Sequence, residues 1–275
     1  MTSETTPTLH TVLGSYPHVG PLKRGEITSD RVRLDFVEVK PTFKAFMPMV
    51  RQQAYDLCEM AIVTYLQARA WRKPLVLLPA VMLGRFRHSA LLYNAERGPL
   101  TPADLPGRRV GVRAYTQTTG AWLRGMLAAD YDIAIDRIHW VTFEDAHVAE
   151  YSDPPGVERA AGQDMTAMLL AGELDAAIFG NDVPADPRLK SVFADPAAEA
   201  RAQEQPEALR DAYRMMVRSK EAGGAPAGGL DMVPFGIEAT RPALALMLDY
   251  ALAQGLIPRA MTVDELYVGT PELPG

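Results

Sequence analysis

The sequence predicts an α/β protein, and three observations support this fold class. Short apolar runs of strand length alternate with segments whose apolar residues follow helical spacing. The chain has 275 residues, of which 48 % are hydrophobic and 23 % charged, as in ordinary globular domains. A turn-rich cluster at Arg97–Gly107, with three prolines and two glycines, separates two such alternating units. We therefore expect the chain to cross between domains at this cluster.

The first unit begins with two predicted strands, Leu9–Tyr16 and Val32–Val39, joined by a turn-rich link at His18–Asp30. A helix is expected next, because four apolar residues share one helical face: Phe43, Phe46, Met47 and Val50. The rest of the unit is predicted as a buried strand or strand end at Leu57–Val63, a short helix at Thr64–Trp71, and strands at Leu75–Leu83 and Ser89–Tyr93.

The second unit repeats the alternation of strand and helix, with its buried helical stripe marked by Met165, Met168 and Leu169. Its predicted elements are strands at Arg109–Ala114, Ile138–Phe143 and Asp175–Phe179 and helices at Thr118–Ala129 and Asp164–Ala171. The remainder is predicted as an irregular stretch at Asp182–Pro196, a helix at Gln203–Lys220, a flexible linker at Glu221–Gly229, and a long helix carrying Leu244, Met247, Leu248, Ala251 and Leu252.

Composition excludes several classes of function. The net charge is −6 and no basic block is present, which argues against nucleic acid and anionic membrane surfaces as partners. No apolar run reaches the eighteen residues of a membrane span, and the first residues lack the pattern of a secretory signal. With Cys58 as the single cysteine, an internal disulfide is excluded. We expect a cytoplasmic protein.

A polar turn follows the predicted strand at Arg109–Ala114 and precedes a helix. Backbone N–H groups and hydroxyls converge in such a turn, and arginine can bind both oxygens of a carboxylate. The alternative is a threonine-capped helix with solvated polar residues, but capping explains Thr118 alone. The turn is therefore a candidate carboxylate site comprising Arg113, Tyr115, Thr116, Gln117, Thr118 and Thr119.

A second cluster follows the predicted strand at Ile138–Phe143 and carries Glu144, Asp145, His147 and Glu150 within seven residues. Histidine titrates near neutral pH, and a carboxylate beside it would fix its tautomer and raise its pKa, as acid–base catalysis requires. A solvated loop with routine charges is the alternative. Glu144 and His147 also have the spacing of half a carboxylate-bridged metal motif, but they follow a strand, so no metal is predicted.

Other candidates lie at strand ends in the first unit. Ser15, Tyr16 and His18 end the first strand, where ligands of open α/β sheets bind, although a solvated turn is equally consistent. Glu59 is a costly carboxylate in an apolar strand unless it is paired or exposed. Near the predicted crossing, one residue of Arg85, Arg87 and His88 is expected to bind a second carboxylate, with His88 preferred. No nucleotide-binding or serine-hydrolase motif is present.

These motifs together resemble the 4,5-dihydroxyphthalate decarboxylase family. The matching segments cover most of the chain in order: Leu13–Val39, Tyr55–Ala68, Gly84–Asn94, Asp104–Leu127, Trp140–Tyr151 with the following DPP, Met168–Gly180 and Pro234–Arg259. Two departures stand out: an apolar strand expected between Ala200 and Gln203 is missing, and FGNDVPADP at Phe179–Pro187 differs from the family pattern.

The resemblance implies a two-lobed α/β fold of the type II periplasmic-binding-protein kind, with a ligand cleft between the lobes. We expect residues 1–95 and 200–275 to form one lobe and residues 96–199 the other. The implied reaction converts 4,5-dihydroxyphthalate to 3,4-dihydroxybenzoate and carbon dioxide without a cofactor, within aromatic and phthalate catabolism.

In that reaction Arg113 and the turn at 116–119 would anchor the substrate. His147, supported by Glu144, would deliver a proton, and His18 would act on the hydroxyl side. A lyase acting on another cyclic carboxylate and a non-catalytic carboxylate receptor are the alternatives, and homo-oligomerisation is left open.

Overall fold

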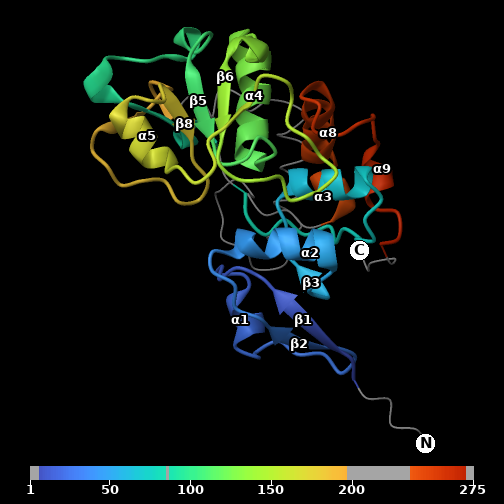
Figure 1. The fold of residues 1–275 in the computed structure, drawn as a ribbon. Coiled ribbons are helices and arrows are strands. Elements are labelled where there is room, and N and C mark those ends of the chain that lie inside the picture. The colour runs from blue at the N-terminus through green and yellow to red at the C-terminus, as the bar shows by residue number, and fades with distance from the viewer. Residues whose placement is uncertain (1–5, 85–86, 197–235, 271–275) are drawn as a thin grey trace, which may run out of the picture.

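The computed structural model describes residues 6–84, 87–196 and 236–270, and Figure 1 shows their arrangement. The predicted helix at Gln203–Lys220, the predicted linker at Glu221–Gly229 and the candidate Arg85 lie outside the described residues. No helix of the described part is long and apolar enough to cross a membrane.

The first sheet is small and entirely parallel, with strand order β2-β1-β3. Its strands are β1 (Thr8–Val12), β2 (Arg33–Phe36) and β3 (Leu57–Cys58). The predictions of the first two strands are confirmed, and the turn-rich link between them contains the short helix α1 (Gly20–Lys23). The segment predicted as a strand at Leu57–Val63 is mostly a connection, since β3 ends at Cys58 and the next helix begins at Ile62.

The second sheet has six strands in the order β7-β6-β5-β8-β4-β9. They are β4 (Leu91–Asn94), β5 (Arg109–Val112), β6 (His139–Thr142), β7 (Glu158–Arg159), β8 (Ala176–Ile178) and β9 (Leu189–Ser191). Strands β7, β6, β5 and β8 are parallel neighbours, whereas β4 runs antiparallel to both β8 and β9. The carboxyl ends of β5 and β6 therefore meet at one edge of the sheet.

Two sequence-based predictions differ from this topology. The segment predicted as a strand at Leu75–Leu83 is irregular apart from a single bridge residue at Ala80; Leu75 packs into the core, while Val76 and Leu78 face solvent. Conversely, β9 lies inside the stretch Asp182–Pro196, which was expected to be irregular. The chain also enters the larger sheet at β4, before the expected boundary between residues 95 and 96. The division into lobes at that boundary and at 199/200 stays a prediction.

The helices cover both sheets and fill the space between them (Figure 1). They are α2 (Phe46–Gln52), which follows a 3-10 turn at Thr42–Ala45, and α3 (Ile62–Ala70), α4 (Thr118–Tyr131), α5 (Met165–Ala171), α8 (Ile237–Ala253) and α9 (Val263–Leu266). Helices α3, α4 and α8 pack against one another, so the carboxyl-terminal segment contacts both earlier parts of the chain. The predicted last helix is confirmed, except that Leu252 lies on its solvent face.

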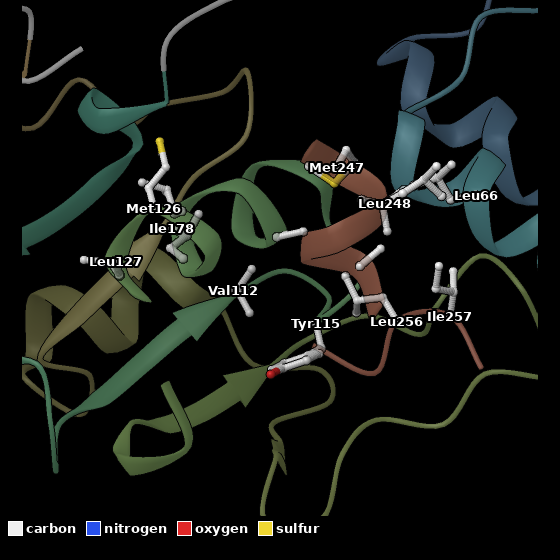
Figure 2. Close-up of a cluster of buried hydrophobic side chains, with 14 of the residues drawn as sticks. Leu66, Val112, Tyr115, Met126, Leu127, Ile178, Met247, Leu248, Leu256 and Ile257 are labelled. Carbon is white, nitrogen blue, oxygen red and sulfur yellow. The ribbon is translucent and has the colours of Figure 1, made fainter. Parts of the chain in front are cut away.

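The main core brings helices α2, α3, α4, α8 and α9 together with the larger sheet, while Met168 and Leu169 of α5 belong to a second cluster. Figure 2 shows Val112 and Ile178 of the sheet and Met126 and Leu127 of α4 in the same cluster as Met247 and Leu248 of α8. Such apolar burial is the main stabilising term of the fold, at about 25 cal/mol per Å² of apolar surface removed from water. It also fixes the start of α4, and with it the polar turn that precedes the helix.

Candidate functional site

The site is built where β5 and β6 end side by side. Arg113 directly follows β5, and its carbonyl accepts hydrogen bonds from the backbone N–H groups of Phe143 (2.9 Å) and Glu144 (2.7 Å), which follow β6. The two polar segments identified in the sequence are thereby joined. The Arg113 guanidinium lies 3.5 Å from the Glu144 carboxylate, measured from Nη1 to Oε2, and 3.8 Å from the ring centre of Phe43.

Arg113 is a largely buried cation, with 20 % of its side chain exposed. Burial lowers its pKa, while the carboxylates of Glu144 and Asp182 act in the opposite direction. Arginine nevertheless stays protonated near neutral pH. A poorly hydrated cation of this kind binds an incoming carboxylate more strongly than a solvated one would.

A pocket of about 240 Å³ opens beside Arg113. Its polar lining combines one cation with three carboxylates, and its apolar lining could cover the faces of a small ring. The polar residues are Arg113, Gln117, Glu144, Gln163, Asp164, Thr166 and Asp182, and the apolar ones are Phe143, Met165 and Phe179. The lining fits a small ligand that presents an anionic group together with hydrogen-bond donors.

The polar turn before α4 contributes less to this pocket than the sequence suggested. Gln117 lines the pocket, but Tyr115 is buried in the core. The guanidinium carbon of Arg124 lies over the Tyr115 ring, 3.8 Å from the ring centre. Thr116 and Thr119 are buried, and Thr119 accepts a hydrogen bond from Arg87 (3.4 Å). Thr118 accepts one from the backbone N–H of Val63 (3.2 Å). These hydroxyls anchor the turn to the rest of the protein.

His147 is half-buried and is influenced by the charge of Arg113, but it is not among the residues that line the pocket. Its Nδ1 is 2.8 Å from the Thr64 hydroxyl, and its ring packs edge-on against Phe46. Burial, together with the positive charges of Arg113 and Arg51, lowers the pKa of His147 to about 4. The imidazole is therefore neutral at pH 7 in the unliganded protein.

The prediction that a carboxylate lies beside His147 and supports it is wrong. Glu144 pairs with Arg113, while Asp145 pairs with Arg159 (2.9 Å). Glu150 pairs with Lys73 (2.6 Å). The pKa of His147 is lowered rather than raised, because the nearest charges are cationic and the ring is desolvated. In the described part of the chain, no three His, Cys, Asp or Glu side chains lie together in a way that could hold a metal ion.

Four predicted residues form a separate cluster at the carboxyl end of β1. Glu59 accepts hydrogen bonds from the backbone N–H of Gly14 (2.7 Å) and from the Tyr16 hydroxyl (2.9 Å). Tyr16 stacks on His18 with ring centres 5.5 Å apart, and Lys23 donates to the Ser15 hydroxyl (3.2 Å). Glu59 is thus a paired carboxylate. No hydrogen bond or ring contact within residues 6–84, 87–196 and 236–270 joins this cluster to Arg113 or His147.

His88 is buried against Phe193, with ring centres 4.9 Å apart, so the structure places it in the core. Burial and the neighbouring Glu59 carboxylate raise the pKa of Cys58 to about 12. At neutral pH this thiol stays protonated and is a poor nucleophile.

Sequence reasoning missed several residues that complete the site. Phe43 and Phe46 were assigned only to the buried face of a helix, yet they contact Arg113 and His147. The sequence did offer a signal for Thr64, because a threonine hydroxyl stands out among the apolar residues of that predicted helix. Asp182 lies in the segment that departs from the family pattern, whereas Gln163 and Asp164 gave no signal of their own.

The fold and this site define an α/β protein of the two-lobed type II periplasmic-binding-protein kind, with a polar pocket beside a buried arginine. Two solved structures share the fold across almost the whole chain. The alkanesulfonate-binding protein of Xanthomonas axonopodis pv. citri, bound to MOPS, matches with a TM-score of 0.53 and 14% identity, covering 96% of this chain and 98% of that one. The periplasmic aliphatic sulphonate binding protein of Escherichia coli matches with a TM-score of 0.54 and 13% identity over the same shares.

Sequence relatives are more specific than these structural neighbours. The chain is 29% identical over 212 residues to a 4,5-dihydroxyphthalate decarboxylase of Comamonas testosteroni, an alignment that covers 70% of this chain and 62% of that enzyme. It is 29% identical over 206 residues to the enzyme of the same name from Pseudomonas putida, covering 70% of this chain and 79% of that enzyme. No protein-family model matches. The resemblance to the 4,5-dihydroxyphthalate decarboxylases is thereby confirmed, and the alignment spans less than two thirds of the first of these relatives.

Proposed function

We propose that the protein is a decarboxylase that converts 4,5-dihydroxyphthalate to 3,4-dihydroxybenzoate and carbon dioxide without a cofactor. The observation that carries the proposal is the largely buried Arg113 at a pocket of ring size, in a chain whose relatives are named for this activity. One buried cation and several carboxylates suit a ligand that has carboxylates at one end and hydroxyls at the other.

The chemistry is consistent with side chains alone. Each ring hydroxyl of the substrate lies para to a carbon that carries a carboxylate. Loss of the hydroxyl proton moves electron density onto that carbon, which accepts a proton. The bond between the ring carbon and the carboxylate then breaks and carbon dioxide leaves. The electron pair of that bond stays with the ring, which becomes aromatic again, and the hydroxyl oxygen regains its negative charge as a phenolate. The phenolate regains a proton, so the dianion consumes one proton overall and yields a monoanion.

In this scheme Arg113 binds the carboxylate that is retained, and His147 delivers the proton to the ring carbon. His147 is neutral in the free protein. A bound dianion would offset the charge of Arg113 and raise the pKa of His147, since nearby opposite charge favours the protonated form. The imidazolium would then form only when substrate is present. Carboxylates of the pocket, such as Asp182, are available to accept hydrogen bonds from the ring hydroxyls.

The direct test is turnover by purified protein dialysed against chelator, with aromatic product and carbon dioxide measured together. The panel contains 4,5-dihydroxyphthalate, phthalate, 3,4-dihydroxybenzoate and an alkanesulfonate. Stoichiometric release of carbon dioxide from 4,5-dihydroxyphthalate alone is expected. Activity that appears only with an added divalent metal would refute the cofactor-free scheme, and tight binding without turnover would identify a receptor. We also propose a cytoplasmic location, which cell fractionation would test.

A further inference from the structure

The first turn of α3 supports both polar segments of the site. The backbone N–H of Val63 donates to the Thr118 hydroxyl (3.2 Å), which holds the turn that follows Arg113. The next residue, Thr64, places its hydroxyl 2.8 Å from Nδ1 of His147. Thr64 is 2 % exposed and His147 is half-buried, so this contact is partly shielded from water. One helix turn thus fixes the position of the anchoring segment and of the histidine.

We propose that Thr64 is a positioning residue, whose hydroxyl holds His147 so that Nε2 carries a hydrogen in both protonation states. The proposal rests on the proposed function, because it assigns how the proton donor of that reaction is oriented. It names a residue that contacts the histidine and not the substrate.

The argument begins with the neutral imidazole. Within the described residues, the contact with Nδ1 is the one hydrogen bond that the Thr64 side chain makes. A buried hydroxyl whose hydrogen finds no acceptor is destabilising, so the hydroxyl donates to Nδ1. A neutral histidine carries one ring hydrogen, which must then be on Nε2.

The same hydroxyl also suits the imidazolium. When Nδ1 gains a proton, the hydroxyl rotates and accepts the new hydrogen bond through its oxygen, since threonine can both donate and accept. A carboxylate at Nδ1 would hold the hydrogen of the neutral ring on Nδ1 and leave Nε2 bare, and a backbone N–H would suit only the neutral ring. The edge-on contact with Phe46 keeps the ring plane in place during this exchange. His147 can therefore change protonation without changing orientation, and Nε2–H faces the same direction throughout.

Nitrogen NMR tests this assignment directly. The chain contains five histidines, and the signals of His147 are identified by their loss in His147→Gln. At pH 7 the wild type and Thr64→Ser should show Nε2 protonated and Nδ1 unprotonated. Thr64→Val, which keeps the shape and removes the hydroxyl, should show a mixture of tautomers. Thr240→Val is the matched control, because it removes a buried helical hydroxyl that contacts Tyr267 (2.7 Å).

Turnover provides the second readout. Thr64→Val should lower kcat about tenfold or more and change KM by less than about threefold. A positioned proton-transfer group contributes about 10²–10⁴-fold to the rate, and the loss of its positioning should remove a part of that contribution. Thr64→Ser should restore kcat. A protonated Nδ1 in the wild type, or an unchanged tautomer in Thr64→Val, would overturn the proposal. A tautomer that depends on Thr64 in a protein without turnover would overturn the proposed function alone.

Discussion

The Arg113 guanidinium lies 3.5 Å from the Glu144 carboxylate, so the cation proposed to anchor substrate already has an anionic partner in the free protein. The two residues follow the adjacent parallel strands β5 and β6, and the Glu144 side chain is 50 % exposed to solvent. Within the described residues Arg113 Nη1 has no hydrogen-bond partner, so an incoming carboxylate could bond it, but the nearby Glu144 carboxylate would repel that ligand. If Arg113 anchors the substrate as proposed, Glu144 is expected to weaken that binding.

Replacement of Glu144 by glutamine should tighten dicarboxylate binding by up to about fivefold. The Glu144 end of this pair is half exposed, so the pair is taken at the value of a solvent-screened one, about 0.2–1 kcal/mol, and its loss frees Arg113 for the ligand. Isothermal titration calorimetry with 4,5-dihydroxyphthalate measures the change. Asp145→Asn, which removes the neighbouring carboxylate paired with Arg159, is the control and should leave affinity unchanged. Weaker binding in Glu144→Gln would show that Glu144 contacts the ligand favourably.

Replacement of Arg113 by alanine should weaken binding of dicarboxylates about 10- to 100-fold, and of monocarboxylates less. A charge-assisted hydrogen bond contributes about 1.5–3 kcal/mol, and it is lost together with the buried cation. Fluorescence or calorimetric titration with phthalates and benzoates separates the two classes. Arg108→Ala, at an exposed arginine paired with Asp175, is the matched control. Equal weakening for both ligand classes would exclude Arg113 as the anchor.

Replacement of His147 by alanine should lower kcat at least about a hundredfold while ligand affinity stays within a few-fold, since a proton donor acts mainly in the transition state. Steady-state kinetics and direct binding measured on the same preparation distinguish these effects. His139→Ala is the control, because His139 is an exposed histidine at the start of β6. Near-normal turnover in His147→Ala would show that another residue donates the proton, and His18 and Glu59 would be tested next.

The pH dependence should differ between the free and the bound protein. The pKa of His147 is about 4 in the free protein, so the protonated fraction falls about tenfold per pH unit between pH 6 and 8. kcat/KM, which reports the free protein, should fall accordingly. kcat should hold to higher pH, because the bound dianion offsets Arg113 and raises the pKa of His147. Arg113 and Arg51 are the charged groups that act on this titration, and both lower the pKa of His147.

Calorimetry in buffers of different ionisation enthalpy provides an independent check. Binding of the dianion at pH 7 should take up a proton in the wild type and none in His147→Gln. A flat kcat/KM between pH 6 and 8 without proton uptake would mean that His147 acts in its neutral form.

Replacement of Gly125 by alanine should destabilise the protein, although alanine is favoured over glycine by about 1 kcal/mol in an exposed helix interior. A Cβ atom at Gly125 would overlap the ring of Tyr250 on α8. Urea denaturation measures the loss. In a Tyr250→Ala background the same change should be neutral or stabilising, because the space is then open. Destabilisation that persists in that background would place the cause outside the contact between α4 and α8.

Much of the fold could be predicted because the relevant signals are local. Apolar runs at Arg109–Ala114 and Ile138–Phe143 become β5 and β6, and the spacing of Leu244, Met247, Leu248 and Ala251 becomes the buried face of α8. Parallel strands end at a common edge, so the sequence by itself placed Arg113 and the segment from Glu144 to His147 at strand ends of one unit, and the pairing of β5 with β6 makes those ends neighbours.

The partners of these residues were decided only by the tertiary structure. His147 bonds Thr64, 83 residues earlier in the chain, and Glu144 pairs with Arg113 instead of the histidine three residues away. The pKa of His147 follows from burial and from Arg113 and Arg51, which belong to other elements. Composition and spacing specify which groups are available. Only packing between distant segments determines how much water reaches each group and which charge lies beside it, and these two quantities set its chemistry.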